Sequence, residues 1–466
     1  MYSSEEIRNA DKRFFTFKLS HRHEALVKLS EIYSPVVAEN IVDALDVFSD
    51  YVTQGDVFGW LANLYDAEIG GFYFSNSARD NDGFLPDLES TTQALGFLYS
   101  SRAANQIAPN IRELLPTWFQ EGVTKFVKEM QDPETGYFYH PQWSKEETDR
   151  HPGRLGRDLG WALRILSSLG QNPTYDTPTG VHGDGIKYDG TLVEKTVAKK
   201  YNVADAPSRP HLESRESFAA LLSELEAQLS VKSWDIGNRF EAEATQITER
   251  DRQLEVMGMK GGLSDMLAEW FAAHQNPLNG AWTEGDRISY DSTNGLLKIS
   301  SVFTKLSRRF PNPAVGIRTA IRCIVDQDVP DTVCHVLNPW YAVNVITKNA
   351  EKYSESEEEL QEVASLRKYI SDNCPRMIMS TLEKLSRFKV GDGSFIYKPI
   401  RKGISQGMRV APDNIFEGDI NATTIAARAI IEHVYDIIDV EMPPLYSGGD
   451  VMRFLNIIEN KKQHLT

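Results

Sequence analysis

The sequence predicts an all-α fold built from helical hairpins, and three observations carry this prediction. Apolar residues recur at three- and four-residue spacing along most of the 466 residues, which is the pattern of helices that bury one face. Strand-like segments are few and short. A loose repeat occurs four times, each time between the end of one helical segment and the start of the next.

Helical periodicity is clearest in amphipathic segments spread over the whole chain. These are residues 23–33, 37–52, 111–130, 263–274 and 359–370. Two strand-like stretches, "GFYF" at 71–74 and "GSFIY" at 393–397, lie at glycine turns. We predict loop excursions or small hairpins there rather than strands of a large sheet.

Residues 171–213 interrupt the helical pattern with a long stretch rich in Gly, Pro and Asp. An irregular loop of this length inside a compact fold is either a functional lid or a linker. Helical segments of similar character lie on both sides of it. We therefore predict one domain over residues 1–466, with 171–213 as an insertion or lid within it.

Composition limits the classes of function. With 41% hydrophobic and 10% aromatic residues, the chain is typical of ordered globular proteins. Its net charge of -16 argues against binding nucleic acid, because a polyanion needs a clustered positive surface. Residues 1–15 contain no apolar signal stretch, and no apolar run approaches the ~20 residues that span a bilayer. These features predict a cytoplasmic protein that does not bind membranes.

The three cysteines, Cys323, Cys334 and Cys374, are widely spaced and form no CxxC pair. We therefore expect neither a disulfide framework nor a structural zinc site. The HExxH and GxxxxGK[ST] motifs of zinc proteases and P-loop proteins are also absent from the sequence. The sequence indicates no metal and no cofactor.

The repeat consists of a helix end, a glycine turn with an aromatic residue, an irregular loop, and an acidic residue that opens the next helix. Its turns are "DAEIGGFYF" (66–74), "QDPETGYFY" (131–139), "QNPLNGAWTE" (275–284) and "VGDGSFIY" (390–397). The predicted openings carry Asp87, Asp158, Asp291 and Asp419. Such hairpins must stack on their neighbours to bury their apolar faces, so closure into a ring is one outcome.

These hairpins resemble the (α/α)6-type helical toroid class. This class includes six-hairpin glycosidases, unsaturated glucuronyl hydrolases, toroidal polysaccharide lyases and, more weakly, terpenoid cyclases. The resemblance covers most of the chain and identifies no specific family. It implies a site at one end of the ring, where carboxylates and aromatic side chains project from inner helix starts and the preceding loops. The matching positions are Asp87, Glu89, Asp158, Asp291, Asp419, Phe72, Tyr139, Trp143 and Trp282.

An aspartate at a helix start has two interpretations. It accepts hydrogen bonds from unpaired backbone N–H groups and interacts favourably with the helix dipole, which contributes roughly 0.5–2 kcal/mol. At a cavity mouth it can also act chemically, because glycosidases use one carboxyl group to protonate the leaving oxygen and another to activate water or attack. We predict Asp158 and Asp291 as the catalytic pair, since Arg157 and Tyr290 stand beside them and could orient them.

The aromatic residues near the turns also have two interpretations. Phe72 and Trp282 either pack a loop onto its helix or form a platform on which a sugar ring stacks. The cluster "YFYHPQW", which contains Tyr139, His140 and Trp143, favours a platform on an exposed loop. His140 is either solvated or a proton carrier.

Positive charge is scarce, and part of it gathers in "YKPIRKGISQGMR" ahead of Asp419. A guanidinium binds a carboxylate with two parallel hydrogen bonds, so Arg401 or Arg409 is a candidate for recognising a uronic acid. Arg154 and Arg157, in "HPGRLGRDLG", raise the same idea. A solvated loop that balances nearby acids is the alternative.

The sequence therefore predicts a carbohydrate-active enzyme, a hydrolase of small uronate-containing or related oligosaccharides. A lyase is the main competitor, because Tyr290, His140, Asn294 and Arg157 are residue types that remove a proton and neutralise a uronate. A non-catalytic helical scaffold or a terpenoid-cyclase-like protein is a further alternative. In a scaffold, the acidic helix starts would be buried caps that face no cavity.

Overall fold

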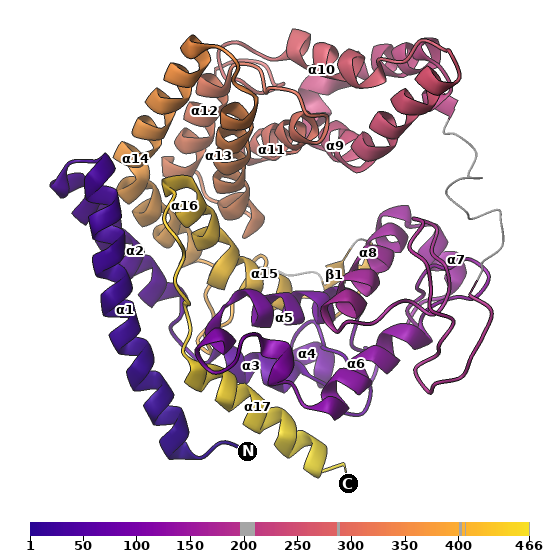
Figure 1. Cartoon of the computed structure of the whole chain (residues 1–466), viewed down its shortest axis with the longest axis vertical. Helices are drawn as coiled ribbons and strands as arrows, with labels where there is room; N and C mark the ends of the chain where they lie inside the picture. Colours follow the sequence, from indigo (N-terminus) through magenta and orange to yellow (C-terminus); the bar gives the residue numbers. More distant parts are fainter. Residues whose placement is uncertain (196–209, 287–288, 400–402, 406, 466) are drawn as a thin grey trace.

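Most of the chain is helical in the computed structural model, which describes residues 1–195, 210–286, 289–399, 403–405 and 407–465 (Figure 1). In these ranges the only paired strands are β1 (Ile404–Ser405) and β2 (Met408–Arg409), which run antiparallel. The stretches predicted as loop excursions form isolated bridges, Tyr65 with Phe72 and Lys389 with Phe395. The all-α class is confirmed.

The helices ahead of the insertion are α1 (Ser4–Ile32), α2 (Pro35–Val52), α3 (Val57–Leu64), α4 (Asn76–Arg79), α5 (Leu88–Ser100), α6 (Thr117–Glu129), α7 (Lys145–Asp149) and α8 (Pro152–Ser168). The helices after it are α9 (Arg215–Val256), α10 (Leu263–His274), α11 (Tyr290–Lys305), α12 (Pro313–Val325), α13 (Cys334–Tyr353) and α14 (Glu357–Leu385). The last ones are α15 (Ile420–Thr424), a π-helical turn (Ile425–Ala429), α16 (Ile430–Ile438) and α17 (Gly448–Gln463). Short 3-10 turns cover Ala103–Gln106, Ile111–Glu113 and Pro210–Leu212.

Two helices depart from simple periodicity. Residues 111–130, predicted as one helix, split at Pro116 into a 3-10 turn and α6. The split has a local cause, because proline lacks an N–H and disfavours helical geometry in the residue before it. Helix α9 bends at Lys232, whose φ of -121° and ψ of 31° lie outside the helical region.

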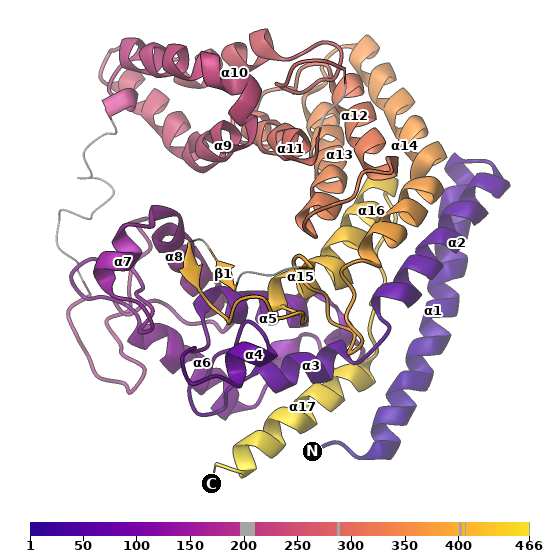
Figure 2. The same ribbon diagram turned by 180° about the vertical axis from the view of Figure 1, so that it is seen from behind.

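The helices follow an arc, with α8 and α9 at its two ends (Figures 1 and 2). One series of contacts runs from α8 to α5, from α5 to α15, and from α16 through α13 and α11 to α9. A second series packs against it, in which α6 contacts α8, α2 contacts α14, α14 contacts α12, and α10 contacts α9. The C-terminal segment therefore joins the two halves of the chain. Closure of this arc into a toroid stays a prediction.

The repeated turns share one backbone geometry. Each contains a glycine in the left-handed region, with φ of +94° at Gly70, +71° at Gly136, +67° at Gly280 and +95° at Gly393. The first three turns are closed by the same hydrogen bond, in which the glycine N–H donates to the carbonyl four residues earlier, at 2.7–2.9 Å. The fourth is a shorter turn that Gly393 closes onto Val390. A side chain at Gly70 or Gly136 would also collide with backbone atoms of a neighbouring segment, so the turns lie directly against the adjacent element.

The prediction that an aspartate opens the helix is correct for two of the four aspartates. Asp87 and Asp419 are the N-caps of α5 and α15 and accept the N–H groups of Ser90 and Ala422. Asp158 is a correction, because α8 begins at Pro152 and Asp158 lies well inside it. A proline is suited to the first helical turn, where its missing N–H costs nothing.

Asp291 is the second correction. The N-cap of α11 is Ser289, whose hydroxyl accepts the Ser292 N–H, and Asp291 stands in the first turn after it. Ser is as good a cap as Asp, so the acidic residue is not needed to start this helix.

The aromatic residues of two turns lie in the main hydrophobic core. Phe72 is 0% exposed and packs on Tyr65 and Phe119. Trp282 is 2% exposed, and its indole N–H donates to the Phe271 carbonyl at 2.8 Å. The structure therefore gives both rings the core role rather than that of a sugar platform.

Residues 171–195 of the insertion contain no helix and are attached to α6, while residues 210–213 contain the 3-10 turn Pro210–Leu212. The buried Lys128 ammonium donates to the Ile186 carbonyl at 2.7 Å and pairs with Asp184 at 3.2 Å. Gln131 and Tyr175 exchange two hydrogen bonds nearby. Its predicted role as a lid stays a prediction, and residues 196–209 lie outside the described residues. Within the described ranges, no helix has both the length and the apolar character that a membrane span requires.

Candidate active site

A single buried arginine holds three carboxyl groups at the junction of α5 and α8. The Arg154 Nε donates to Asp158 at 2.9 Å, one helical turn further along α8. Its Nη2 lies 3.5 Å from Asp87, and its Nη1 lies 3.8 Å from Glu89. The side chains of all four residues are at most 5% exposed. The guanidinium also lies 4.6 Å from the ring centroid of Trp143, an arrangement that favours a cation.

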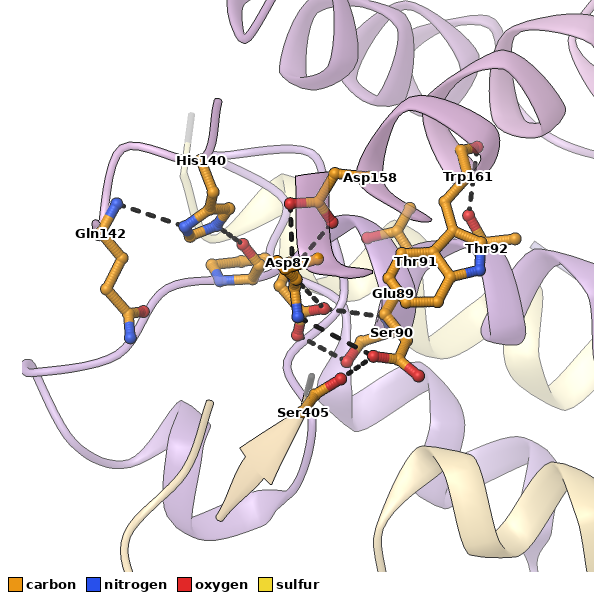
Figure 3. Close-up of polar contacts among 12 residues, drawn as sticks. Asp87, Glu89, Ser90, Thr91, Thr92, His140, Gln142, Asp158, Trp161 and Ser405 are labelled. Atoms are coloured by element: carbon orange, nitrogen blue, oxygen red, sulfur yellow. Dashed lines mark hydrogen bonds and ion pairs between the residues drawn. The ribbon is translucent and has the colours of Figure 1, made fainter. Parts of the chain in front are cut away.

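The start of α5 explains how two of these carboxyl groups are placed (Figure 3). Asp87 caps the helix, with Oδ1 accepting the Ser90 N–H at 3.1 Å and Oδ2 accepting the Ser90 hydroxyl at 2.7 Å. These bonds fix Asp87 in a structural role. Glu89 follows in the first turn, and its Oε2 accepts a hydrogen bond from the hydroxyl of Ser405 at the end of β1.

Burial gives two of the carboxyl groups different proton affinities. Loss of hydration, reinforced by the charge of Asp87, raises the pKa of Glu89 from 4.5 to about 8, against the opposing effect of Arg154. Loss of hydration also raises the pKa of Asp158, but the closer Arg154 limits it to about 6. Near neutral pH, Glu89 therefore keeps its proton while Asp158 is mostly ionised.

Several buried polar atoms around these carboxyl groups lack a hydrogen-bond partner. They are Nη1 and Nη2 of Arg154, Oδ1 of Asp158 and Oε1 of Gln93, the residue one turn after Glu89 on α5. Buried polar atoms are nearly always hydrogen-bonded, and exceptions concentrate where a ligand or a reaction uses them. Most of these atoms are held by ion pairs instead, because Nη1 and Nη2 face Glu89 and Asp87, and Oδ1 of Asp158 lies 2.9 Å from Arg154 Nε. Among these atoms, Oε1 of Gln93 is the acceptor that no ion pair engages.

His140 has a structural role and is not a proton carrier. Its Nδ1 accepts the Gln142 N–H at 3.2 Å, so the proton lies on Nε2, which donates to the Pro86 carbonyl at 2.6 Å. Burial lowers the pKa of His140 to about 4, so the ring is neutral. Because both of its nitrogens are hydrogen-bonded, His140 ties the loop after the second glycine turn to Pro86, in the loop after the first.

A pocket of about 370 Å³ lies beside His140. The residues that line it include His140, Tyr139, Pro86, Phe126 and Lys125 of α6. Tyr139 is half-buried, and its hydroxyl donates to Asp149 at 3.0 Å. Trp143 thus lies against Arg154, whereas Tyr139 lines the pocket, and the predicted sugar platform stays a prediction.

The predicted basic residues are less tightly placed. Arg157 is exposed one turn beyond Arg154, and its guanidinium lies 5.8 Å from the Trp161 ring. Arg409 is also exposed, pairs with Asp413 at 3.6 Å and lies 5.6 Å from the Phe84 ring. Arg401 lies outside the described residues.

The remaining candidates form a separate group at the start of α11. The rings of Tyr290 and His335 stack in parallel at 4.9 Å, and His335 lies 3.6 Å from Asp291, whose side chain is 72% exposed. Asn294 is buried and accepts a hydrogen bond from Asn338 of α13 at 2.6 Å. The ion pairs of Arg154 thus unite Asp158 with Asp87 and Glu89, whereas the predicted partner Asp291 pairs with His335.

Asp419 belongs to neither group but lies next to the first. Its carboxylate accepts the N–H groups of Ala422 and Tyr397 at 2.9 and 2.8 Å. The residue after it, Ile420, donates its N–H to the carbonyl of Phe74, in the segment that leads to Asp87. Among the described residues, no three His, Cys, Asp or Glu side chains gather in a way that could hold a metal ion.

No protein-family model, curated protein or solved structure matches this chain. The function therefore rests on the side chains of the site, since one fold hosts many activities.

Several residues of the cluster were not predicted as its members. The i,i+4 spacing of Arg154 and Asp158 on one helix was a readable signal for their pairing. Ser405 lies 316 residues from Glu89, so no local pattern joins them. Its sequence "GISQG" does match the GxSxG string of serine hydrolases, but here the serine ends a strand of a β-hairpin instead of a strand-to-helix elbow. Gln93 carried no signal of its own.

Proposed function

We propose that this chain is a glycoside hydrolase in which Glu89 is the general acid and Asp158 the partner carboxylate. The observation that supports this most is the pair of buried carboxyl groups whose proton affinities are pushed apart around Arg154. Glycosidases depend on such a pair, one group protonated and the other ionised at the working pH. In this proposal Glu89, a predicted substrate-binding residue, replaces Asp291 as the partner of Asp158.

The chemistry assigns each group a task. The proton of Glu89 passes to the glycosidic oxygen as the bond from this oxygen to the anomeric carbon breaks. Asp158 either takes a proton from the attacking water or forms a bond to the anomeric carbon. In the second case, water then attacks this carbon and breaks its bond to Asp158. Arg154 holds both carboxyl groups in place. The Ser405 hydroxyl donates a hydrogen bond to one oxygen of Glu89. In the substrate complex, the leaving oxygen of the substrate takes the place of this hydroxyl.

Charge around the cluster favours a neutral sugar at the point of cleavage. Arg154 supplies one positive charge, whereas Asp87 and Asp158 supply two negative charges when Glu89 is protonated. A uronate carboxylate next to them would be repelled. A uronate-containing substrate would therefore place its carboxylate one sugar away, beside the exposed Arg157. A cytoplasmic enzyme of this kind would act on small imported oligosaccharides.

The proposal includes closure of the helices into an (α/α)6-type toroid. Support comes from the contact series α8, α5, α15–α16, α13, α11 and α9, against which α6, α2, α14, α12 and α10 pack. In such a ring the starts of α5, α15, α13 and α11 would face one end. The Arg154 cluster would lie at this end, because Asp87 caps the start of α5.

The lyase alternative has one observation in its favour, the stacked Tyr290 and His335 beside Asn294. A lyase needs a tyrosine or histidine that readily gives up a proton. Burial instead raises the pKa of Tyr290, whose hydroxyl donates to the Asp328 carbonyl at 2.9 Å, so this tyrosine keeps its proton. Burial lowers the pKa of His335 and keeps its ring neutral, but its Nδ1 already accepts the Asp331 N–H at 3.3 Å. The hydrolase is therefore the better supported of the two.

Hydrolysis of a panel of oligosaccharides tests the proposal. The panel contains neutral disaccharides and uronate-containing oligosaccharides, and new reducing ends are measured by chromatography. We expect turnover of at least one member by the wild type, and a fall of about 10²-fold or more in Glu89→Gln and Asp158→Asn. Asp291→Asn is the matched control and should retain full activity.

Three results would contradict the hydrolase. Full turnover by Glu89→Gln would remove the general acid from the mechanism. Failure of the wild type to cleave any member of the panel would remove the activity itself. New ultraviolet absorbance from an unsaturated uronide would instead establish the lyase.

A further inference from the structure

Helices α5 and α15 begin with the same hydrogen-bonded arrangement, although they lie at opposite ends of the chain. The Asp87 N–H donates to the Phe72 carbonyl at 3.2 Å, and the Asp419 N–H donates to the Phe395 carbonyl at 2.9 Å. Both phenylalanines follow a glycine turn of the repeat. The two helix starts are therefore equivalent members of one structural unit.

A threonine completes each unit. The Phe72 N–H donates to Thr91 Oγ1, and the Phe395 N–H donates to Thr423 Oγ1, both at 3.0 Å. Both threonines stand four residues after the capping aspartate. By the same count, Glu89 and Asn421 occupy equivalent positions, two residues after each cap.

The contact between α5 and α15 brings these equivalent positions together. The Gln93 Nε2 donates to Asn421 Oδ1 at 3.1 Å and lies 3.4 Å from Glu89 Oε1. The other amide atom of Gln93, Oε1, is buried without a hydrogen-bond partner. An amide pair therefore lies directly beside the group proposed as the general acid, with an acceptor to spare.

The chain after Asn421 has an unusual geometry as well. The π-helical turn Ile425–Ala429 follows α15 at once and widens the helix by one residue. Such turns are rare and are concentrated at functional sites. This second observation comes from backbone geometry and is independent of the side-chain contacts of Gln93.

We propose that Gln93 and Asn421 form a subsite that binds hydroxyl groups of a neutral sugar next to Glu89, an inference that rests on the proposed hydrolase function. An amide offers a donor and an acceptor, which match the O–H groups of a sugar ring. Neither amide carries a charge that would offset the nearby carboxyl groups, so an anionic sugar ring is disfavoured at this position.

Saturation-transfer NMR with methyl glycosides tests the subsite without requiring turnover. The probes are the methyl glycosides of glucose, galactose, xylose and glucuronate, and the deoxy forms of the neutral sugars. We expect the wild type to bind at least one neutral glycoside. Gln93→Met and Asn421→Leu, which keep the side-chain size, should weaken this binding tenfold or more. Asn373→Leu on α14 is the matched control and should bind as the wild type does.

The deoxy glycosides keep the test valid if a variant fails to fold. Against the wild type, loss of the contacted hydroxyl should weaken binding by a similar factor. Unchanged affinity in both variants, preference for the glucuronoside over every neutral sugar, or no binding of any probe would overturn the subsite. If the subsite fails in this way but hydrolysis still depends on Glu89, the proposed hydrolase function is retained. Full turnover by Glu89→Gln would remove the hydrolase itself.

Discussion

The starts of α5 and α11 look alike in the sequence but have different environments in the structure. Both carry an aspartate ahead of an apolar run. In α5 the aspartate is itself the cap and is buried, whereas in α11 Ser289 is the cap and Asp291 points into solvent. The residue that caps the helix thus decides whether the carboxylate is fixed or free.

The partners of the two carboxylates differ in the same way. Asp87 shares the fully buried Arg154 with Glu89 and Asp158, while Asp291 has only a half-buried histidine 3.6 Å away. Buried charges interact strongly because little water screens them. Exposed pairs contribute little. Reactivity and stability should therefore depend on the first cluster and hardly on the second.

Replacing Arg154 should produce the largest effect. Arg154→Met leaves Asp87 and Asp158 buried without a cation, and we expect the free energy of unfolding to fall by about 3–5 kcal/mol. Denaturant unfolding measures this change. The exposed Arg157→Met, three residues along the same helix, is the control and should stay within about 0.5 kcal/mol of the wild type. Equal effects of the two substitutions would show that burial of Arg154 is unimportant.

The pH dependence of stability should reveal Glu89. Its folded pKa of about 8 lies above its ordinary value of 4.5, so protonated Glu89 stabilises the fold. This contribution is complete below pH 4.5 and is lost as the pH rises through about 8. The slope is at most about 1.4 kcal/mol per pH unit. In Glu89→Gln the decline should be shallower by this amount, while Asp291→Asn should leave it unchanged. Parallel curves for the wild type and Glu89→Gln would contradict the shift.

The threonines four residues after each cap provide a smaller contrast. Thr91 accepts the N–H of Phe72 from a distant segment, whereas Thr293 in α11 donates to the Ser289 carbonyl within its own helix. Thr91→Val leaves a buried N–H unpaired and should cost about 1–3 kcal/mol, and Thr293→Val should cost less. Thermal unfolding of both variants checks the order, and a larger loss for Thr293→Val would reverse the comparison.

Asp291→Asn should have the smallest effect of all. Its carboxylate is exposed and its pairing with His335 is loose, so the free energy of unfolding should change by under about 0.5 kcal/mol. Chemical denaturation measures it directly. A loss of several kcal/mol would mean that the α11 start carries as much energy as the Arg154 cluster.

The repeated turns could be predicted from the sequence because their chemistry is local. A left-handed glycine and an acidic or amide residue four positions earlier define the first three turns wherever they occur. The helix openings were only half right, since the start of α8 depends on Pro152 and that of α11 on Ser289. Each of these lies a few residues from the aspartate expected to do the same task.

The site itself was less accessible to sequence reasoning. Asp87, Glu89 and Asp158 were all named as candidates, and they do lie together. The predicted pairing of Asp158 with Asp291 stays a prediction, since Asp158 makes an ion pair with Arg154 and Asp291 lies beside His335. The contacts of Glu89 with Ser405 and of Gln93 with Asn421 join residues more than 300 positions apart. Only the folded chain brings them together.

The central claim is that Glu89 keeps its proton at neutral pH. Carbon-13 NMR of protein labelled at the glutamate side-chain carboxyl carbon measures this directly, with Glu89→Gln used to assign the signal. The structure predicts a titration midpoint near the pKa of about 8, far above the other glutamates. A midpoint near the ordinary value of 4.5 would show that Glu89 is ionised at neutral pH and cannot act as the general acid.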